Sequence, residues 1–454
     1  MEKFLVSELL DVFDGQLEQE GTVPFITSAS IDSRTIAPGG LYIPIIGESM
    51  DGHQFIQNAI DNGAVAVLTQ QPDCTAPEEI TVIRVDSTKD ALQALGRANR
   101  HRYHIPVVAV TGSSGKTTTK DVIAAVLSQK CKTMKTQGNY NNQLGVPQTL
   151  FQLDGSYGAA VVEMGMDHLG DIRETIDEVT PHYAVITNIG TAHLEFLKTQ
   201  ENILKAKMEI LETMGEGDYA ILNGDDPYLN RISETPYRII RIGIDSDALD
   251  YRAENIESSS EGVRFTLDGE AYHFRFPGIH NVYNAMAAIV IAKDLELSQA
   301  QIQGGFDAFV PSGNRMKVET IGGITYIDDS YNANPDSMRA ASNTLRAMGE
   351  EKGRCIAVIG DMLEMGETGW ELHRKVGETV GEIADILIAV GDLAKAYVQG
   401  ASGKLPAEAI HHCEDAVDAA LMLKNIAAPG DTVLIKASHG VHLEKIMESV
   451  KEED

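Results

Sequence analysis

The stretch that decides the fold is Val107-Val108-Ala109-Val110-Thr111-Gly112-Ser113-Ser114-Gly115-Lys116-Thr117-Thr118-Thr119-Lys120. It combines an apolar run at 107–110, a glycine-rich turn and a helical pattern near 117–129, an order typical of a phosphate-binding loop. Glycine lets backbone N–H groups approach phosphate oxygens, and the N-terminus of a helix favours negative charge. The stretch therefore predicts a site for ATP or GTP, formed by Gly112, Ser113, Ser114, Gly115, Lys116, Thr117 and Thr118.

Two side chains at the start of the predicted helix have distinct roles in such a loop. Lys116 can reach the β- and γ-phosphates, and the Thr117 hydroxyl can bind Mg²⁺. The general phosphate-loop pattern has its first glycine where this chain has Val110, so the loop is the variant G-x-x-G-K-T-T. A glycine-rich turn without a ligand is the plainer alternative, and the strand–loop–helix context argues against it.

Further apolar runs follow at 159–162, 183–186 and 218–222, and helical patterns lie between them. Fully apolar strands that alternate with helices indicate a parallel sheet covered on both faces. Two segments with alternating polarity, 263–267 and 272–276, flank an Asp-Gly turn and predict an antiparallel hairpin. The centre of the chain is thus expected to be a parallel-sheet nucleotide domain with a β-hairpin region.

Two more α/β blocks flank this centre. Apolar runs at 324–327, 355–359, 386–390 and 432–435 predict a second doubly wound, Rossmann-like domain. The first hundred residues carry strand patterns at 41–46, 64–68 and 80–85 and a helical pattern near 89–101. We therefore expect an α/β protein of three domains, covering residues 1–100, 101–312 and 313–454.

Composition and charge exclude several classes of protein. The chain of 454 residues has 37 Lys and Arg against 67 Asp and Glu, a formal net charge of −30. A general nucleic-acid binder needs a basic face, so no nucleic-acid partner is expected. Its four cysteines are widely spaced, which fits a reduced compartment. Because there is neither an apolar run of about 18 residues nor a signal-peptide pattern, we expect no membrane span and a cytoplasmic location.

Polar residues follow the strands of the predicted central sheet, where open α/β sheets bind ligands. Glu163 ends one strand, and His193 follows the next. Either could contact metal or nucleotide, although a solvated glutamate and a structural histidine are the commoner alternatives. Lys207 lies on a predicted helix, where an exposed lysine is the simplest interpretation. The run Asn139-Tyr140-Asn141-Asn142 suits polar ligand groups, or a turn.

The last block has polar clusters at the ends of three predicted strands, at 328–335, 360–362 and 436–440. Helix capping explains part of the first cluster. Three clusters at one sheet edge nevertheless predict a binding site there. Arg315, at the start of this block, could place a guanidinium on a phosphate.

Taken together, and in this order, several motifs resemble the ATP-dependent Mur ligases of peptidoglycan synthesis. The resemblance covers most of the chain. The matching motifs are Thr111–Lys120, Gly138–Asn142, Glu163-Met164-Gly165, Thr187–Glu195, Ala206-Lys207, His280–Ala285 and Asp328–Pro335. Within the family, Asp329–Asn334, Gly360-Asp361-Met362 and Asp32-Ser33-Arg34 are similar to the members that add D-alanyl-D-alanine.

The resemblance implies an ATP-dependent ligase that joins D-alanyl-D-alanine to the terminal carboxylate of UDP-N-acetylmuramoyl-tripeptide through an acyl phosphate. The first domain would bind the UDP-muramyl substrate, the central domain ATP, and the last domain would close over both. A carboxylate and a triphosphate repel, so Lys116, the helix N-terminus and Mg²⁺ would have to stand between them. We expect a monomer. The resemblance does not identify the third residue of the stem peptide or the residues that bind the dipeptide.

The resemblance also implies roles for individual residues. Lys116, Lys207, His193 and Glu163 would be catalytic. Thr117, Glu163, His193 and Lys207, the last as a carbamate, would hold Mg²⁺. Asn281, Asn284, Arg315 and Asp329 would contact the nucleotide. Ser33 and Arg34 would lie near the UDP-sugar. Asn139, Asn142, Tyr331, Asn332 and Asn334 are the remaining candidates for substrate contacts.

Two other functions stay open at this point. A sister amide ligase, either another muramyl ligase or a folylpolyglutamate synthase, would share the architecture and differ in the amino-acid acceptor. A non-catalytic nucleotide-binding protein with a phosphate loop would not need Glu163, His193, Arg315 and Asp329 together.

Overall fold

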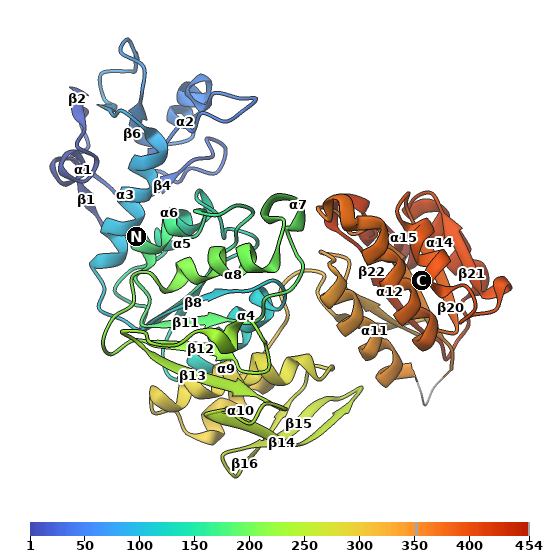
Figure 1. The fold of residues 1–454 in the computed structure, drawn as a ribbon. Helices are drawn as coiled ribbons and strands as arrows, with labels where there is room; N and C mark the ends of the chain where they lie inside the picture. Colours follow the sequence, from blue (N-terminus) through green and yellow to red (C-terminus); the bar gives the residue numbers. More distant parts are fainter. Residues whose placement is uncertain (350–352, 453–454) are drawn as a thin grey trace.

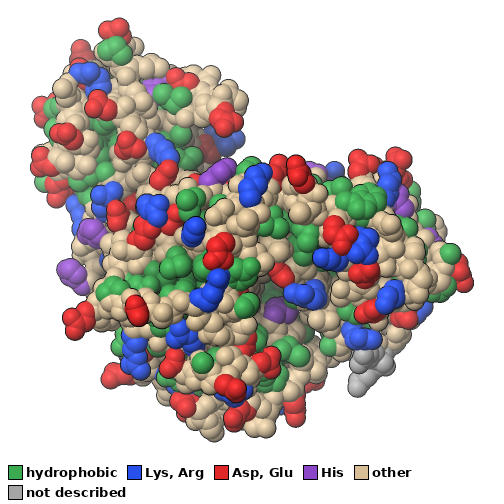
Figure 2. All heavy atoms as spheres, viewed as in Figure 1, with side chains coloured by type: hydrophobic (Ala, Val, Ile, Leu, Met, Phe, Trp, Pro, Cys, Tyr) green, Lys and Arg blue, Asp and Glu red, His purple; other side chains and the backbone are tan. Residues whose placement is uncertain are grey.

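The computed structural model describes residues 1–349 and 353–452, which form three α/β units, each built around its own sheet. Figure 1 shows the N-terminal and C-terminal units standing on different sides of the central one. None of the helices in these residues is long and apolar enough to cross a membrane. Acidic side chains are spread over the whole face seen in Figure 2.

The central sheet has nine strands in the order β16-β15-β14-β13-β12-β11-β8-β10-β9. The strands from β9 to β14 pair in parallel. The predicted apolar runs are β8, β10, β11 and β12, whereas β9 and β13 were not predicted. The side chains of β8, β10 and β11 are buried on both faces because helices cover both. The strands are β8 (Val107–Thr111), β9 (Thr133–Lys135), β10 (Ala159–Glu163), β11 (Tyr183–Ile186), β12 (Tyr219–Asn223), β13 (Arg238–Gly243) and β14 (Tyr251–Ser259).

The helices of this unit form two layers. One layer contains α4 (Lys116–Leu127), α9 (His280–Asp294) and α10 (Gln299–Asp307), and the other contains α5 (Gly145–Leu150), α6 (Arg173–Val179) and α8 (Gln200–Met208). Because α4 begins directly after β8, its N-terminus lies at the carboxyl edge of the sheet, where a ligand site is expected.

The predicted hairpin is present as β15 (Gly262–Leu267) and β16 (Glu270–Phe274), paired antiparallel around the Asp-Gly turn. It is not a separate element. The strand β14 joins it to the parallel sheet, pairing parallel with β13 and antiparallel with β15. The sequence analysis did not identify β14, which alternates irregularly between buried and exposed residues and contains a register shift.

The C-terminal sheet has six strands in the order β17-β18-β22-β19-β20-β21. The four predicted strands are its four inner members, β18 (Ile324–Asp328), β22 (Thr432–Lys436), β19 (Cys355–Gly360) and β20 (Ile386–Val390). Two edge strands were not predicted: β17 (Lys317–Ile321) and β21 (Ile410–Cys413). The helices of this unit are α11 (Pro335–Gly349), α12 (Gly369–Ile383), α13 (Ala394–Ala401), α14 (Ala416–Ile426) and α15 (Glu444–Glu452).

The N-terminal sheet has five strands in the order β2-β7-β6-β5-β4. The prediction of a strand over 41–46 was too long, since β5 is only Gly40–Tyr42. Pro44 follows closely and has no N–H to donate to a ladder. Helix α3 (Thr88–His101) runs from this unit onto the central one, where Asn99 donates to the carbonyl of Leu150. The other elements are α1 (Val6–Phe13), β2 (Gln16–Gln19), β4 (Ser28–Ser30), α2 (Ile56–Asp61), β6 (Ala64–Thr69) and β7 (Thr81–Arg84).

Candidate active site

A cavity of about 1040 Å³ lies between the central and C-terminal units. The carboxyl edges of both parallel sheets face it, as expected for open α/β sheets. From the central unit it is lined by Ser113–Thr119, Asn139, Asn142, Glu163, Asp167, His193 and Asn284, and from the C-terminal unit by Arg315, Asp329, Tyr331, Asn332, Asn334 and Lys436, among others. Most of the predicted site residues therefore come together in one place.

The phosphate loop is held in shape by the segment that follows β11. Thr187 donates from Oγ1 to the carbonyl of Ser114 (2.6 Å), and the backbone N–H of Ser114 donates to Asn188 Oδ1 (3.0 Å). A Cβ at Gly112 would lie 1.7 Å from Thr187 Oγ1, and Gly112 has φ +152°. Glycine is thus required here both by the backbone conformation and by the close approach of the Thr187 side chain.

Lys116 begins helix α4, and its ammonium donates to the carbonyl of Gly112 (2.8 Å). It forms no ion pair with any residue that the structure describes. Desolvation lowers the pKa of Lys116, and Glu163 opposes this effect. A cation without a carboxylate partner at a helix N-terminus is ready for an anionic ligand, as a phosphate-binding lysine must be.

Glu163 ends strand β10 and is only 2% exposed, so it is not the solvated surface group of the simpler alternative. Its Oε1 accepts a hydrogen bond from Asn141 Nδ2 (2.9 Å), while its Oε2 has no hydrogen-bond partner. The nearest cation to Oε2 is the fully buried Lys120, whose Nζ lies 3.6 Å away. An orphaned carboxylate oxygen in a buried position fits a hard divalent cation such as Mg²⁺.

Lys120 was not singled out from the sequence, although it belongs to the quoted loop. It lies on α4 one turn beyond Lys116, and its Nζ donates to the carbonyl of Thr136 (2.9 Å). The signal that could have identified it is a lysine on the buried face of a helix that follows a phosphate loop, because buried lysines are rare without a partner.

Lys207, on α8, is 1% exposed, which excludes the interpretation as an ordinary surface lysine. Its amine has no hydrogen bond and no ion pair with the residues described. Burial, and next the charge of Lys116, lower the pKa of Lys207 well below its usual value. A lowered pKa raises the fraction of neutral amine at any given pH, and the neutral amine is the form that reacts with CO₂.

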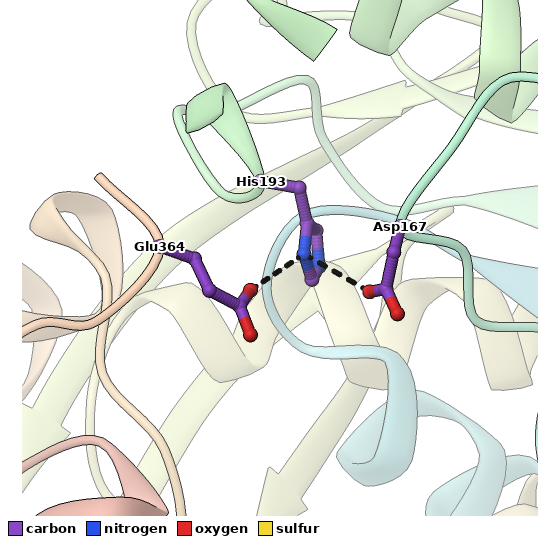
Figure 3. A group of neighbouring side chains, drawn as sticks. All are labelled: Asp167, His193 and Glu364. Carbon is purple, nitrogen blue, oxygen red and sulfur yellow. Dashed lines mark hydrogen bonds and ion pairs between the residues drawn. The ribbon is translucent and has the colours of Figure 1, made fainter. Parts of the chain in front are cut away.

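His193 contacts two carboxylates, as Figure 3 shows. Its Nδ1 lies 2.9 Å from Glu364 Oε2 and 3.2 Å from Asp167 Oδ1. The ligand atoms of the three residues lie within 4.8 Å of one another, a grouping that could hold a metal ion. The hydrogen bond from His193 lowers the pKa of the Glu364 carboxyl. Sequence reasoning found His193 but missed both carboxylates, since nothing local in the sequence connects them.

On the C-terminal side one buried lysine pairs directly with a carboxylate, whereas Arg315 contacts an aromatic ring. Lys436 is buried and donates to Asp329 Oδ2 (2.5 Å) and to the carbonyl of Asn332 (2.8 Å). The Arg315 guanidinium lies over the ring of Tyr331, 3.7 Å from its centroid. Asn334 reaches the phosphate loop, where its Nδ2 donates to Ser114 Oγ (3.1 Å).

Some predicted residues do not line this cavity, among them Gly112 and Lys207. Asn281 lies behind Asn284, whose Nδ2 donates to Asn281 Oδ1 (2.8 Å), so it supports a lining residue. Ser33 and Arg34 lie in the N-terminal unit; Ser33 is buried, whereas Arg34 is exposed and pairs with Asp32 (2.8 Å). Asn142 lines the cavity, but its Oδ1 also accepts from the N–H of Gly145, as a turn residue would.

Comparison with known proteins gives one consistent family. Three family models match the chain: "Mur ligase family, catalytic domain" over residues 25–100, "Mur ligase middle domain" over 110–292 and "Mur ligase, glutamate ligase domain" over 314–439. The UDP-N-acetylmuramoyl-tripeptide–D-alanyl-D-alanine ligase of Bacillus subtilis (strain 168) is 35% identical over 459 residues, covering 100% of this chain and 99% of that protein. The ligase of the same name from Escherichia coli (strain K12) is 33% identical, with 98% of both chains covered.

Solved structures agree with this result. The chain is similar to MurF from Acinetobacter baumannii with a TM-score of 0.90 and 31% identity, covering 100% of this chain and 99% of that one. It is also similar to the MurF ligase of Thermotoga maritima in complex with ADP, with a TM-score of 0.82 and 26% identity over 94% of this chain and 97% of that one.

Proposed function

The chain belongs to the Mur ligase family, and we propose that it uses ATP to join D-alanyl-D-alanine to the terminal carboxylate of UDP-N-acetylmuramoyl-tripeptide. It is an ATP-dependent ligase, as its full-length relatives are. The observation that carries the proposal is one cavity in which the phosphate loop and a buried carboxylate, with one oxygen that accepts no hydrogen bond, face the charged groups of the C-terminal domain.

The first chemical step is phosphoryl transfer. A carboxylate oxygen of the tripeptide attacks the γ-phosphorus of ATP, the bond to the β–γ bridging oxygen breaks, and ADP leaves. The Lys116 ammonium and the loop N–H groups stabilise charge on the phosphate oxygens. The tight turn at Gly112 and the hydrogen bond from Thr187 to Ser114 hold these donors in place before the substrate binds, so little reorganisation is needed during the reaction.

The second step forms the peptide bond. The amine of D-alanyl-D-alanine attacks the acyl carbon, a tetrahedral intermediate collapses, and phosphate leaves while the nitrogen loses a proton. Water would hydrolyse the acyl phosphate, so the cavity must be closed between two domains. The contact between Asn334 and the phosphate loop supports this role for the C-terminal domain.

Mg²⁺ fits the residues present, because Glu163 Oε2 is buried and accepts no hydrogen bond, and the Lys120 ammonium lies 3.6 Å from it. Thr117, Glu163, His193 and Lys207, the last as a carbamate, would hold it. When bound, the ion neutralises charge between the carboxylate and the triphosphate. The carbamate forms when the neutral Lys207 amine attacks CO₂, which makes an N–C bond and releases a proton. Its buried, unpartnered amine supports this assignment.

The remaining roles follow the division into three domains. Residues 1–100 would bind the UDP-muramyl group through Ser33 and Arg34, residues 101–312 ATP, and residues 313–454 would complete the nucleotide site through Arg315 and Asp329. Asn281 and Asn284 support the nucleotide side of the central domain. Asn139, Asn142, Tyr331, Asn332 and Asn334 are the proposed substrate contacts. We propose that the enzyme acts as a monomer in the cytoplasm.

Phosphate release from Mg·ATP by the purified protein tests the function. The reaction is run with UDP-N-acetylmuramoyl-tripeptide alone, with D-alanyl-D-alanine alone and with both, and the product is identified by mass. Release that requires both substrates and yields the pentapeptide supports the proposal. Release with the tripeptide and a single amino acid instead of the dipeptide moves the chain to a sister amide ligase. ATP binding without release in any combination indicates a non-catalytic nucleotide-binding protein.

A further inference from the structure

The side chain of His193 is held by a carboxylate that comes from another domain. His193 lies in the loop before α7 (Leu194–Leu197) of the central domain, whereas Glu364 lies in the loop after β19 of the C-terminal domain. The two residues are 171 positions apart, yet Nδ1 and Oε2 are 2.9 Å apart with hydrogen-bond geometry. In Figure 3 the carboxylate of Glu364 and that of Asp167 approach the imidazole from opposite sides.

The backbone shows that this contact is built into the fold. His193 has φ +59° and Glu364 has φ +62°, a left-handed conformation that residues other than glycine rarely adopt. Such strain persists only where surrounding contacts enforce it, and it often marks a functional site. A backbone hydrogen bond from Glu195 N–H to the carbonyl of Glu364 (3.2 Å) joins the same two loops.

Between the two carboxylates, Glu364 is the one that orients the ring. An imidazole Nδ1–H can direct one good hydrogen bond, and the contact with Glu364 meets the geometric criteria, while Asp167 at 3.2 Å forms only an ion pair. Asp167 also belongs to the central domain, so its position relative to His193 does not depend on how the C-terminal domain sits.

In the neutral imidazole, a proton held on Nδ1 by a carboxylate leaves the lone pair on Nε2, where a cation can bind. Histidines that bind metals commonly donate their other N–H to a carboxylate, which sets the tautomer and the ring orientation. We propose that Glu364 is a positioning residue that reaches across the domain boundary to orient His193, so that the histidine is prepared for Mg²⁺ only when the C-terminal domain is docked. This inference rests on the proposed function in one respect, the role of His193 toward Mg²⁺.

The loop that carries Glu364 is exposed, so its residues can be substituted to test the proposal. The side chain of Glu364 is 48% exposed, so Glu364→Ala should not unfold the domain. Glu364→Gln keeps an oxygen that can accept from Nδ1–H and serves as the conservative variant. Glu367→Ala is the matched control, because Glu367 is exposed, lies three residues further on, and has no hydrogen bond or ion pair among the described residues.

The first measurement needs no substrate. Protein labelled with ¹⁵N in histidine is studied by NMR, and the His193 signal is assigned by its loss in His193→Gln. We expect the Nδ1–H tautomer in the wild type and in Glu367→Ala, and a shift to the Nε2–H tautomer in Glu364→Ala. An unchanged His193 tautomer in Glu364→Ala overturns the inference, whatever the enzyme's activity is.

The second measurement is the Mg²⁺ concentration that gives half-maximal phosphate release with both substrates. Loss of such a supporting carboxylate typically costs 10- to 100-fold in metal affinity or activity. We expect a rise of about 10-fold in Glu364→Ala, a smaller rise in Glu364→Gln, and less than a twofold change in Glu367→Ala, with ATP affinity unchanged in all three. Equal Mg²⁺ dependence in Glu364→Ala and wild type contradicts the proposal.

The two measurements separate the two hypotheses. If the wild type itself releases no phosphate, the proposed function fails, and the NMR result still decides whether Glu364 sets the state of His193. If the wild type is active and Glu364→Ala changes neither the tautomer nor the Mg²⁺ dependence, the function stands and the positioning role is wrong.

Discussion

The two walls of the cavity are built in opposite ways. On the central-domain side, the charged groups are only partly satisfied: Glu163 Oε2 has no hydrogen bond and only a 3.6 Å ion pair with Lys120, Lys116 has no carboxylate, and Lys207 behind them has no polar contact among the described residues. On the C-terminal side, Lys436 and Asp329 pair directly, and Arg315 lies on an aromatic face.

The difference indicates where the ligand charge belongs. A buried charge without a partner is costly, so a fold that keeps several of them must gain a compensating interaction when the ligand binds. A wall whose charges are already paired loses little when it moves away. The central wall is therefore the fixed charge-binding surface, and the C-terminal wall is suited to a domain that docks and separates.

The largest effect is expected at Lys207. Replacing it with alanine or methionine should lower the rate of ligation by roughly 10²- to 10³-fold, the size expected when a charge-stabilising group is lost. Lys207→Arg should not restore activity, because a guanidinium cannot form the carbamate. The unfolding temperature of ligand-free Lys207→Met should be equal to or higher than that of the wild type, since an unpartnered buried amine is removed. Steady-state kinetics and calorimetry measure both quantities.

The control for this prediction is Lys205→Met, which changes an exposed lysine on the same helix. Adding bicarbonate to CO₂-depleted protein should raise the activity of the wild type and not that of Lys207→Met. As the pH falls through the lowered pKa of Lys207, the amine becomes protonated and the activation should be lost. Full activity of Lys207→Ala would remove the residue from the mechanism and weaken the contrast between the walls.

The opposite result is expected at Lys436. Its replacement by methionine leaves the Asp329 carboxylate, whose side chain is only 13% exposed, without its cation. Breaking a fully buried pair typically costs about 3–5 kcal/mol of stability, and a somewhat smaller loss is expected here. Lys436→Met should therefore lower the unfolding temperature of the ligand-free protein. The double variant Lys436→Met/Asp329→Asn should recover part of the loss, because the unpaired charge is then absent.

Lys445→Met, at an exposed lysine of the same domain, is the control for Lys436→Met and should leave the unfolding temperature unchanged. If Lys436→Met is as stable as the wild type, the ion pair between Lys436 and Asp329 does not stabilise the C-terminal wall. The comparison of the two walls would then fail on that side.

The strands that the sequence predicts well are those whose signal is local. The apolar runs of β8, β10, β11 and β20 are buried in the middle of parallel sheets, so their composition alone specifies them. The strands β14 and β21 are partly exposed and carry polar residues, and their pairing is provided by a neighbour that the sequence does not reveal.

The same distinction applies to the site. Gly112 and Lys116 could be assigned because a phosphate loop is one continuous segment with a known local geometry. The burial of Glu163 and Lys207 could not be assigned, since it depends on the packing of several helices around them. Glu364 could not be found at all, because its contact with His193 exists only when two separately folded domains meet.

The smallest effect concerns a buried carboxylate far from this cavity. Glu178, on α6, is fully buried, and neither of its oxygens has a hydrogen-bond partner. It faces helix α3, where a Cβ at Gly96 would lie 3.1 Å from its Oε2. Burial raises the pKa of Glu178 to about 9 from a usual 4.5. This carboxyl can stay neutral by keeping its proton.

The pH dependence follows from the direction of this shift. Between pH 4.5 and about 9 the folded state holds a proton that the unfolded state has lost, so stability falls as the pH rises through this window. Glu178→Gln, which is neutral in both states, should be more stable than the wild type near pH 8 and nearly equal to it near pH 4.5. Ligase activity should not change, because Glu178 does not line the cavity.

Unfolding temperatures of the two proteins between pH 4.5 and 9 measure this difference. The matched control is Asp177→Asn, which makes the same chemical change at the exposed neighbouring position. A difference that does not grow with pH would mean that Glu178 is ionised in the folded protein. Buried charged groups without hydrogen-bond partners would then occur in this fold outside the cavity as well. The similar groups around the phosphate loop would no longer indicate which wall binds the ligand.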